Sequence, residues 1–275
     1  MTKFALINKK LTPIKEAKIS INERGFLFGD GIFETCRVDH GRIYNFAAHI
    51  QRIKLGLEAL KFDADIADLE KQCYRLITKN QIRHAILRIS ISRGIGSKGY
   101  APTYDSKALI VIQTKNKTPL KKQKITLALA SKPKPPSNAL PIHCKTAQSL
   151  PYILNKMEAQ EKGVFDCVML TQQGYVSETS AANIFWVKDG QLFTPSSTCD
   201  VVLGTIRQKI IDHFEVTQIN ATIDALQKAD EVFLTNVSHL VLNVNEFEKR
   251  QYDRNEIGTY VMKFLKKDIT STLQP

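Results

Sequence analysis

The stretch Tyr175-Val-Ser-Glu-Thr-Ser-Ala-Ala-Asn-Ile-Phe-Trp186 decides how the second half of the chain folds. It has the pattern of a strand that stops, passes through five small or polar residues and then resumes as a strand. Glu178 stands at the interruption, where its carboxylate can point into a cavity; capping a turn, or pairing with a nearby cation, is the alternative. Asn183 can fix this loop through hydrogen bonds from its side chain to the backbone.

Two segments on either side of this stretch offer complementary chemistry. Lys145 lies between a proline-rich loop and a predicted helix, among small and apolar neighbours. Partial burial there would leave its amine neutral and able to form a Schiff base, and an ordinary solvated lysine is the alternative. Gly204, Thr205 and Ile206 open a predicted helix, where free backbone N–H groups and the helix dipole favour a phosphate. A glycine that merely caps the helix is the alternative there.

Further polar residues could serve the same phosphate. Arg52 lies one turn after His49 on a predicted helix and can clamp a phosphate with two hydrogen bonds, although an exposed helical arginine is equally compatible with the pattern. Thr235 and Asn236 end an apolar strand, where they can supply donors or simply begin a turn.

The first half of the chain holds candidates for substrate contacts. Arg93 and Lys98 flank a glycine-rich segment that is similar to an anion-binding loop but lacks the lysine-serine signature of a P-loop. Arg93 can equally be structural, and Lys98 can face water or a substrate carboxylate. Thr35 alternates with Glu34 on a predicted strand, so its hydroxyl is expected on a face that lines a cleft. The histidines are too scattered for a metal site, and no metal is predicted.

Composition limits the classes of protein that the chain can belong to. No run of apolar residues is long enough to span a membrane, and no signal peptide is recognisable. The five cysteines form no Cys-x-x-Cys pair, so a reducing cytoplasm is expected. The formal net charge of +12 comes from dispersed lysines and arginines, without a nucleic-acid motif. We therefore expect a small anionic ligand as partner, and neither nucleic acid nor a membrane.

The order of predicted elements indicates an α+β protein of two domains with a cleft between them. Strands are predicted at residues 4–8, 18–21 and 31–38, the last leading into a hairpin, followed by two helices and two more strands. The charged segment 115–123 is the expected linker. It separates an N-terminal domain, residues 1–114, from a C-terminal domain, residues 124–275.

Taken together, five segments in one order resemble the fold-type IV pyridoxal-phosphate enzymes, a family of branched-chain aminotransferases, D-amino-acid aminotransferases and 4-amino-4-deoxychorismate lyases. They are Phe28-Gly-Asp-Gly-Ile-Phe-Glu-Thr35, His49-Ile-Gln-Arg52, Lys145, Glu178 and Gly204-Thr-Ile-Arg207. The resemblance implies a smaller N-terminal α/β domain, a larger C-terminal β-barrel-like domain that binds pyridoxal 5′-phosphate, and a homodimer.

The resemblance also assigns roles. By this resemblance, Lys145 occupies the position of the Schiff-base lysine. Glu178 occupies that of the carboxylate that pairs with the pyridine nitrogen, and Arg52 that of the arginine that binds the phosphate. Phe28 falls among the substrate contacts, and Thr35 would assist departure of the leaving group.

Within the family, the segments Ile91–Tyr100 and Ser180–Trp186 are most similar to those of the lyases, which release pyruvate from aminodeoxychorismate to form 4-aminobenzoate. An aminotransferase that uses the same lysine and glutamate is the runner-up. Two departures concern the substrate side: Lys98 replaces a common arginine, which weakens a planar carboxylate clamp, and no asparagine follows Lys145 closely.

Overall fold

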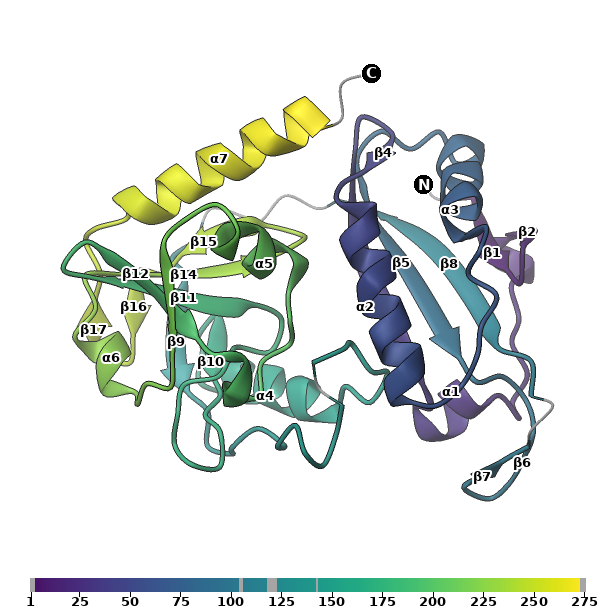
Figure 1. Ribbon diagram of the computed structural model, residues 1–275, viewed down its shortest axis with the longest axis horizontal. Helices are drawn as coiled ribbons and strands as arrows, with labels where there is room; N and C mark the ends of the chain where they lie inside the picture. Colours follow the sequence, from purple (N-terminus) through teal and green to yellow (C-terminus); the bar gives the residue numbers. More distant parts are fainter. Residues whose placement is uncertain (1–2, 104–105, 118–122, 142, 273–275) are drawn as a thin grey trace. The chain divides into compact units, whose positions relative to one another are not determined.

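The computed structural model describes residues 3–103, 106–117, 123–141 and 143–272, apart from the side chains of Ser97 and Lys98. Helices and strands alternate through it, which confirms the expected α+β class (Figure 1). The chain divides into two compact units. The first consists of Met1–Thr118, Cys144–Gln148 and Ser271–Pro275, and the second of Pro119–His143 and Ser149–Thr270.

A six-stranded antiparallel sheet organises the first unit, in the order β2-β1-β8-β5-β3-β4. Its strands are β1 (Phe4–Ile7), β2 (Lys10–Pro13), β3 (Gly31–Asp39), β4 (Arg42–Ile43), β5 (Ala85–Ser92) and β8 (Leu109–Asn116). The smaller elements of this unit are η1 (Ile14–Glu16), α1 (Arg24–Phe28), and the paired β6 (Ser97–Lys98) and β7 (Ala101–Pro102).

Two helices cover one face of this sheet: α2 (Phe46–Ala59) packs on β3, and α3 (Leu69–Lys79) packs on β1 and β8 (Figure 1). The covered face is apolar because successive side chains of a strand point to opposite sides of a sheet. Ile32, Cys36 and Val38 of β3 are therefore buried in the core under these helices, whereas Phe33 and Thr35 lie on the opposite, less buried face.

Gly31, in the signature segment Phe28–Thr35, is the first residue of β3 and packs against the backbone of β5. A Cβ atom at this position would lie 2.6 Å from the carbonyl oxygen of Ile91 and 2.8 Å from the Cα of Ser92, both in the backbone of the neighbouring strand β5. Only glycine allows the two backbones to approach so closely, because backbone atoms cannot swing away as a flexible side chain can. Gly31 thereby fixes where β3 starts against β5.

The second unit contains two sheets. One has the order β10-β9-β16-β17 and the other β13-β12-β11-β14-β15. The strands are β9 (Thr126–Leu129), β10 (Asp166–Val168), β11 (Asn183–Lys188), β12 (Gln191–Pro195), β13 (Val216–Ile219), β14 (Glu231–Asn236), β15 (Leu240–Asn243), β16 (Glu246–Phe247) and β17 (Arg250–Gln251). The helices are α4 (Leu150–Glu161), η2 (Ser197–Cys199), α5 (Thr205–Ile211), α6 (Asp224–Gln227) and α7 (Glu256–Thr272).

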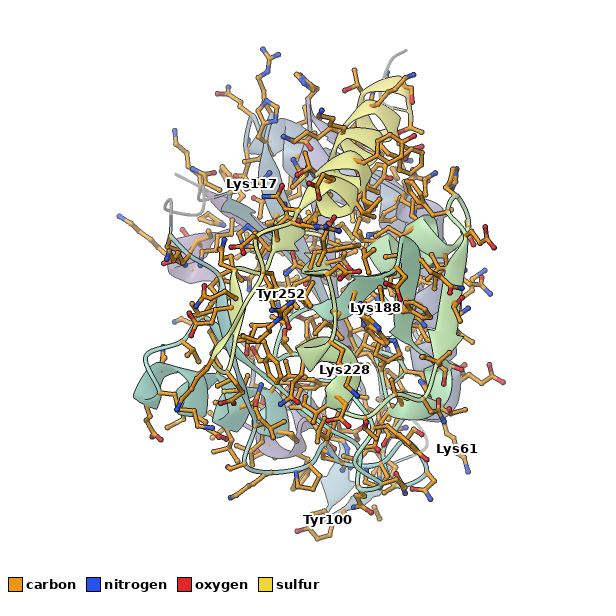
Figure 2. All side chains as sticks on the ribbon, turned by 90° about the vertical axis from the view of Figure 1, so that its left-hand side faces the viewer. Lys61, Tyr100, Lys117, Lys188, Lys228 and Tyr252 are labelled. Atoms are coloured by element: carbon orange, nitrogen blue, oxygen red, sulfur yellow. The ribbon has the colours of Figure 1, made fainter. Side chains whose placement is uncertain are left out.

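Aromatic side chains pack around the five-stranded sheet of this unit. Phe185 of β11 and Phe233 of β14 face each other in the ladder and stack with ring centroids 5.2 Å apart. Tyr252, labelled in Figure 2, is buried and donates its hydroxyl to the carbonyl of Leu226 at 2.7 Å. Burial raises the pKa of Tyr252 well above its usual value, so the hydroxyl stays a donor.

Most of the predicted elements are present, with ends shifted by a few residues, but one prediction is wrong. Residues 18–21 form no strand, and Ile19 and Ile21 are 50% and 77% exposed. Alternating apolar residues form a strand only where one face can be buried, and these two side chains bury little. Within the described residues, no helix has the length and apolar character needed to cross a membrane.

Candidate active site

The carboxylate of Glu178 is the centre of a buried polar cluster in the second unit. Its backbone pairs with Asn183 in an isolated antiparallel bridge, which closes the predicted interruption of the strand. One carboxylate oxygen, Oε2, accepts hydrogen bonds from the Asn183 side chain at 2.9 Å and from the Val202 backbone at 3.1 Å. The other, Oε1, accepts from the Lys134 ammonium and from the Tyr152 hydroxyl, the latter at 3.3 Å.

Lys134 is the residue of this cluster that the sequence analysis missed. It lies in the proline-rich loop between β9 and α4, its side chain is 1% exposed, and its ammonium forms an ion pair with Glu178. The loop is tied down by a hydrogen bond from the Lys134 backbone to the Leu170 carbonyl at 2.8 Å. The neighbouring Lys132 has the same proline context but is exposed, so nothing in the local sequence marks Lys134.

Tyr152 completes the surroundings of Glu178. Burial, and next the negative charge of Glu178, raise the pKa of Tyr152 well above its usual value. The hydroxyl therefore stays protonated and donates to the carboxylate. The Lys134 ammonium also lies 5.2 Å from the centre of the Tyr152 ring, where a cation is favoured.

Asn183 links Glu178 to the start of α5. Its side-chain amide also donates to the Val202 carbonyl at 2.9 Å. A Cβ atom on Gly204 would lie 2.1 Å from the Asn183 Oδ1, so this glycine makes room for the asparagine as well as preceding the helix. The predicted helix start is confirmed at Thr205, and a helix start presents backbone N–H groups that have no partner within the helix.

Several polar atoms in this part of the second unit are buried without a partner among the described residues. They are the hydroxyls of Ser177, Thr205 and Thr235 and the Nε of Arg207. Thr235 stands opposite Asn183 in the ladder between β11 and β14, and Asn236 donates to the Ala181 carbonyl at 3.1 Å. Buried polar groups are normally satisfied, so the unpaired Thr205 hydroxyl at the start of α5 fits a ligand that carries a phosphate.

The predicted phosphate arginine lies in the first unit, in a buried cluster with Glu34 and His49. The Nε and Nη2 of Arg52 bond the two oxygens of Glu34 at 2.5 and 2.8 Å, and the His49 Nδ1 lies 2.7 Å from the same carboxylate. Burial by itself would raise the pKa of Glu34, but the hydrogen bonds from Arg52 and His49 outweigh it and lower the pKa to about 2. The carboxylate thus stays ionised and orients the guanidinium.

Lys145 also belongs to the first unit, where its segment packs against the start of β3. The backbone N–H of Phe33 donates to the Lys145 carbonyl at 2.8 Å, and that of Ala147 donates to the Gly31 carbonyl at 2.8 Å. The Lys145 amine lies 4.9 Å from the centre of the Phe33 ring. Phe33 and Thr35 share a face of β3, so the predicted Schiff-base amine and the Thr35 hydroxyl serve the same side of the sheet.

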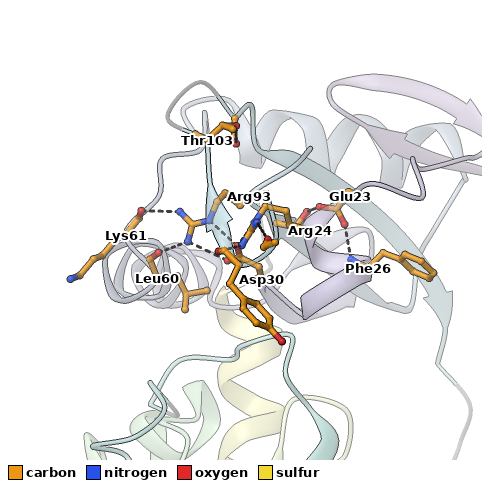
Figure 3. Close-up of polar contacts among 12 residues, drawn as sticks. Glu23, Arg24, Phe26, Asp30, Leu60, Lys61, Arg93 and Thr103 are labelled. Carbon is orange, nitrogen blue, oxygen red and sulfur yellow. Dashed lines mark hydrogen bonds and ion pairs between the residues drawn. The ribbon is translucent and has the colours of Figure 1, made fainter. Parts of the chain in front are cut away.

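Arg93 is tied down by several partners within the first unit. Its guanidinium bonds both carboxylate oxygens of Asp30, at 2.8 and 3.2 Å, and the carbonyls of Lys61 and Leu60 at 3.0 and 2.7 Å (Figure 3). Arg24 bonds the same aspartate at 2.7 Å. The predicted substrate contact of Arg93 would have to replace one of these partners, and its present role is to hold α1 and α2 against β5.

The other two predicted substrate contacts lie close to this network. Phe28 packs against Tyr100 with ring centroids 5.5 Å apart and carries the Arg24 guanidinium 5.0 Å from its own ring centre. Lys98 lies in β6, and its side chain is outside the described part of the structure. The Tyr100 side chain is 86% exposed and projects from the ribbon in Figure 2.

Each unit thus gathers part of the predicted site. The second unit holds Glu178, Asn183, Gly204, Thr205, Ile206, Thr235 and Asn236, and the first holds Lys145, Arg52, Thr35, Phe28, Arg93 and Lys98. The segment around Lys145 was predicted for the C-terminal domain, but it packs with the first unit, because it runs beside β3.

Comparison with known proteins gives the family. Residues 31–247 match the model of the amino-transferase class IV family. The chain is 29% identical to the aminodeoxychorismate lyase of Bacillus subtilis, over 90% of this chain and 87% of that protein. It is 25% identical to the D-alanine aminotransferase of Bacillus licheniformis, over 98% and 95% of the two chains. A T.th. branched-chain amino acid aminotransferase with pyridoxamine 5′-phosphate superposes with a TM-score of 0.90 at 23% identity, covering 97% and 94% of the two chains.

The fold and the family match define an enzyme of the pyridoxal-phosphate class. The chain belongs to the amino-transferase class IV family, whose cofactor is pyridoxal 5′-phosphate. This confirms the resemblance and the cofactor that the sequence analysis predicted.

A Glu34→Gln variant tests the Arg52 cluster through its pH dependence. Because folding lowers the pKa of Glu34 from 4.5 to about 2, its carboxylate adds stability above pH 4.5, of about 3 kcal/mol. That contribution disappears as the pH falls towards 2. Denaturant unfolding should show a large deficit for the variant at pH 7 that narrows below pH 4.5. A deficit that is constant with pH would contradict this, and Glu58→Gln, on the exposed side of α2, is the matched control.

A double-mutant cycle tests the ion pair between Lys134 and Glu178. Removing one partner of a buried pair leaves the other charge unmatched, so Lys134→Met should lower the free energy of unfolding by roughly 3–5 kcal/mol. Adding Glu178→Gln should cost less in that background than in the wild type, whereas additive costs would mean that the pair does not couple. Lys132→Met, in the same loop, should have little effect.

Proposed function

We propose that this chain is a 4-amino-4-deoxychorismate lyase, which uses pyridoxal phosphate to release pyruvate from aminodeoxychorismate and form 4-aminobenzoate for folate biosynthesis. The observation that carries the proposal is the shared face of β3, where the Lys145 amine lies against Phe33 and Thr35 follows two residues along the strand. An elimination needs a base at the carbon that loses a proton and a donor at the oxygen that leaves. A lysine amine and a hydroxyl on one face can divide these tasks.

The residues of the second unit would hold the cofactor at its pyridine and phosphate ends. The Glu178 carboxylate would accept a hydrogen bond from the protonated ring nitrogen. The Thr205 hydroxyl and the start of α5 would bind the phosphate, together with Arg52 of the first unit. When bound, the cofactor supplies an electron sink for the electrons left when the substrate loses a proton. Asn183 holds Glu178 in place, and the absence of a side chain at Gly204 leaves room for that asparagine.

The proton and leaving-group steps fall to residues of the first unit. The Lys145 amine would hold the cofactor at rest and, once the substrate amine replaces it, take the proton from the ring carbon that bears this amine. Loss of that proton and of the enolpyruvyl oxygen makes the ring aromatic. The Thr35 hydroxyl would give its proton to the departing oxygen, so that the three-carbon fragment leaves as pyruvate.

The alternative is an aminotransferase for D-amino acids or branched-chain amino acids. It would use Lys145 and Glu178 in the same roles but return the proton to the cofactor and pass the amine to a keto acid. The likeness to the D-alanine aminotransferase of Bacillus licheniformis supports it.

Product analysis separates the two functions. The purified protein with pyridoxal phosphate should be yellow and convert aminodeoxychorismate to 4-aminobenzoate and pyruvate in equal amounts. Lys145→Ala should lose the absorbance of the lysine-bound cofactor, and borohydride should no longer fix the cofactor to the chain. Thr35→Val should keep the colour but form pyruvate at least about tenfold more slowly, because general acid catalysis contributes that much or more.

Three outcomes would contradict parts of this proposal. A colourless protein after incubation with pyridoxal phosphate would end the assignment of the cofactor. Amine transfer to 2-keto acids without pyruvate release would favour the aminotransferase. Unchanged pyruvate formation by Thr35→Val would remove Thr35 from the leaving-group step.

We also infer that the active form is a homodimer. The exposed side of α4 carries the apolar residues Leu150, Ile153, Leu154 and Met157, which are 45–62% exposed. Exposed apolar side chains grouped on one helix are a common mark of a protein interface. Light scattering should give the mass of two chains, and Ile153→Glu should shift the mass towards one chain. A monomeric wild-type protein with full activity would contradict this inference.

A further inference from the structure

A cavity of about 520 Å³ lies in the first unit and is lined by residues of α3, of the segment before α3, and of the chain around β1 and β8. Sites for small molecules have volumes in this range and are mostly apolar, with a few polar groups that fix the ligand. The apolar part of the lining fits this description, since it consists of Leu6, Ala64, Leu69, Ala108, Ile110 and Ile112. The cavity can therefore hold a molecule the size of a substituted aromatic ring.

The cavity lies on the helix-covered face of the six-stranded sheet. Ile112 of β8 stands opposite Ile89 of β5, and Ile89 stands opposite Glu34 of β3. Residues directly opposite each other in an antiparallel pair point to the same side of a sheet, so Ile112 shares the face of Glu34. Thr35, on the proposed catalytic face, points the other way. A ligand in the cavity would thus bind separately from the substrate.

One wall of the cavity is the turn between β1 and β2, which is held in place by several bonds. The backbone N–H of Asn8 donates to the Ile110 carbonyl at 2.9 Å, and the Asn8 Oδ1 accepts from the Ile110 N–H at 2.9 Å. The Lys9 ammonium pairs with Asp65 at 2.5 Å, and its carbonyl accepts from Arg75 at 2.9 Å. These bonds join the turn to β8, to α3 and to the segment before α3, so the wall is fixed without a ligand.

The polar part of the lining carries more negative than positive charge, although the whole chain has a formal net charge of +12. Asp63, Asp65 and Asp68 are exposed and line the cavity together with Lys9 and Lys107. Lys9 neutralises Asp65, whereas Asp63 and Asp68 form no ion pair within the described part of the chain. The two free carboxylates outweigh the one ammonium of Lys107, so the cavity favours a cation.

The helix that follows Asp68 does not use its carboxylate. Asp68 stands at the N-terminal cap of α3, but its side chain accepts no hydrogen bond from that helix. Gln72 also lines the cavity, and its buried Oε1 has no hydrogen-bond partner among the described residues. Side chains four positions apart on a helix are neighbours. A carboxylate and an amide oxygen that both lack donors therefore lie on the same wall.

We propose that this cavity is a second ligand site, which binds a small organic cation that has an apolar body and N–H donors, an amidine or an amine. Its charged N–H groups would bind Asp63 and Asp68 and supply the donor that Gln72 lacks, since hydrogen bonds between charged partners are the stronger ones. Its apolar body would lie on the aliphatic lining and lose contact with water. An anion of the same shape would meet two unpaired carboxylates and bind poorly.

Three probes of one shape test the inference: benzamidine, benzamide and benzoate, which are positive, neutral and negative. Each is titrated by calorimetry into the protein loaded with pyridoxal phosphate, and again into the protein without it. We expect benzamidine to bind at least about threefold more tightly than benzamide, and benzoate more weakly than either, because an exposed ion pair contributes an energy of this size. The order should be the same with and without the cofactor, since the cavity lies on the other face of the sheet.

The place of binding is read from the methyl signals of the protein. Carbon-13 spectra should show benzamidine shifting the methyl groups of Leu69 and Ile110, which line the cavity, and leaving the Thr35 methyl group unchanged. Ala64→Leu, which fills part of the cavity with a larger apolar side chain, should abolish these shifts and the binding of benzamidine and benzamide alike.

Charge variants show whether the carboxylates select the cation. Asp63→Asn combined with Asp68→Asn should weaken benzamidine roughly three- to tenfold and leave benzamide unchanged, because both exposed side chains keep their size and lose only their charge. Glu70→Gln is the matched control: Glu70 is an exposed acid of α3 that does not line the cavity, and its variant should bind all three probes as the wild type does.

Four results would overturn the inference. They are benzoate or benzamide binding as tightly as benzamidine, methyl shifts that leave Leu69 and Ile110 unchanged, full affinity for benzamidine in Ala64→Leu, and equal losses of benzamidine and benzamide in the double aspartate variant. The product assay is measured separately. A protein that fails the lyase assay but shows the expected order of the probes would refute the proposed reaction and leave this inference standing.

Discussion

The buried carboxylate of Glu178 constrains the second unit more than any other group, because an ionised side chain in the interior must be matched by donors. The backbone N–H of Val202 and the side-chain amide of Asn183 donate to this carboxylate. The Lys134 ammonium and the Tyr152 hydroxyl are the other two donors. Together they fix the proline-rich loop, the first turns of α4 and the approach to α5 around one point. Loss of any one of them would loosen segments that are far apart in the sequence.

In the first unit, strand β3 also carries a buried carboxylate that is matched by donors, and it carries a different set of side chains on its other face. Glu34 points into the core, where Arg52 and His49 keep it ionised, whereas Phe33 and Thr35 point to the opposite side with Lys145 and Arg88. The alternation of side chains along a strand thus separates a structural ion pair from groups that can meet a substrate. A shift of β3 by one residue would exchange the two sets, and the close contact of Gly31 with β5 opposes such a shift.

Structural elements could be predicted from the sequence where local turn or helix chemistry favours a particular residue type. The hairpin after β3, the helix start at Thr205 and the interruption at Glu178 follow from turn chemistry and periodicity. Residues 18–21 were mispredicted, because alternation says nothing about whether a neighbouring strand exists to bury one face. Lys134 was missed for a related reason: its importance comes from Glu178, a partner distant in sequence that only the fold brings near.

In the proposed mechanism, Glu178 must remain an anion that keeps the cofactor nitrogen protonated, with Lys134 as its counter-charge. The direct measurement is the ¹⁵N chemical shift of pyridoxal phosphate labelled at its ring nitrogen and bound to the wild-type protein. In the wild-type protein we expect the shift of a protonated ring nitrogen at neutral pH, and in Glu178→Gln the shift of an unprotonated nitrogen. An unprotonated nitrogen in the wild-type protein would contradict it.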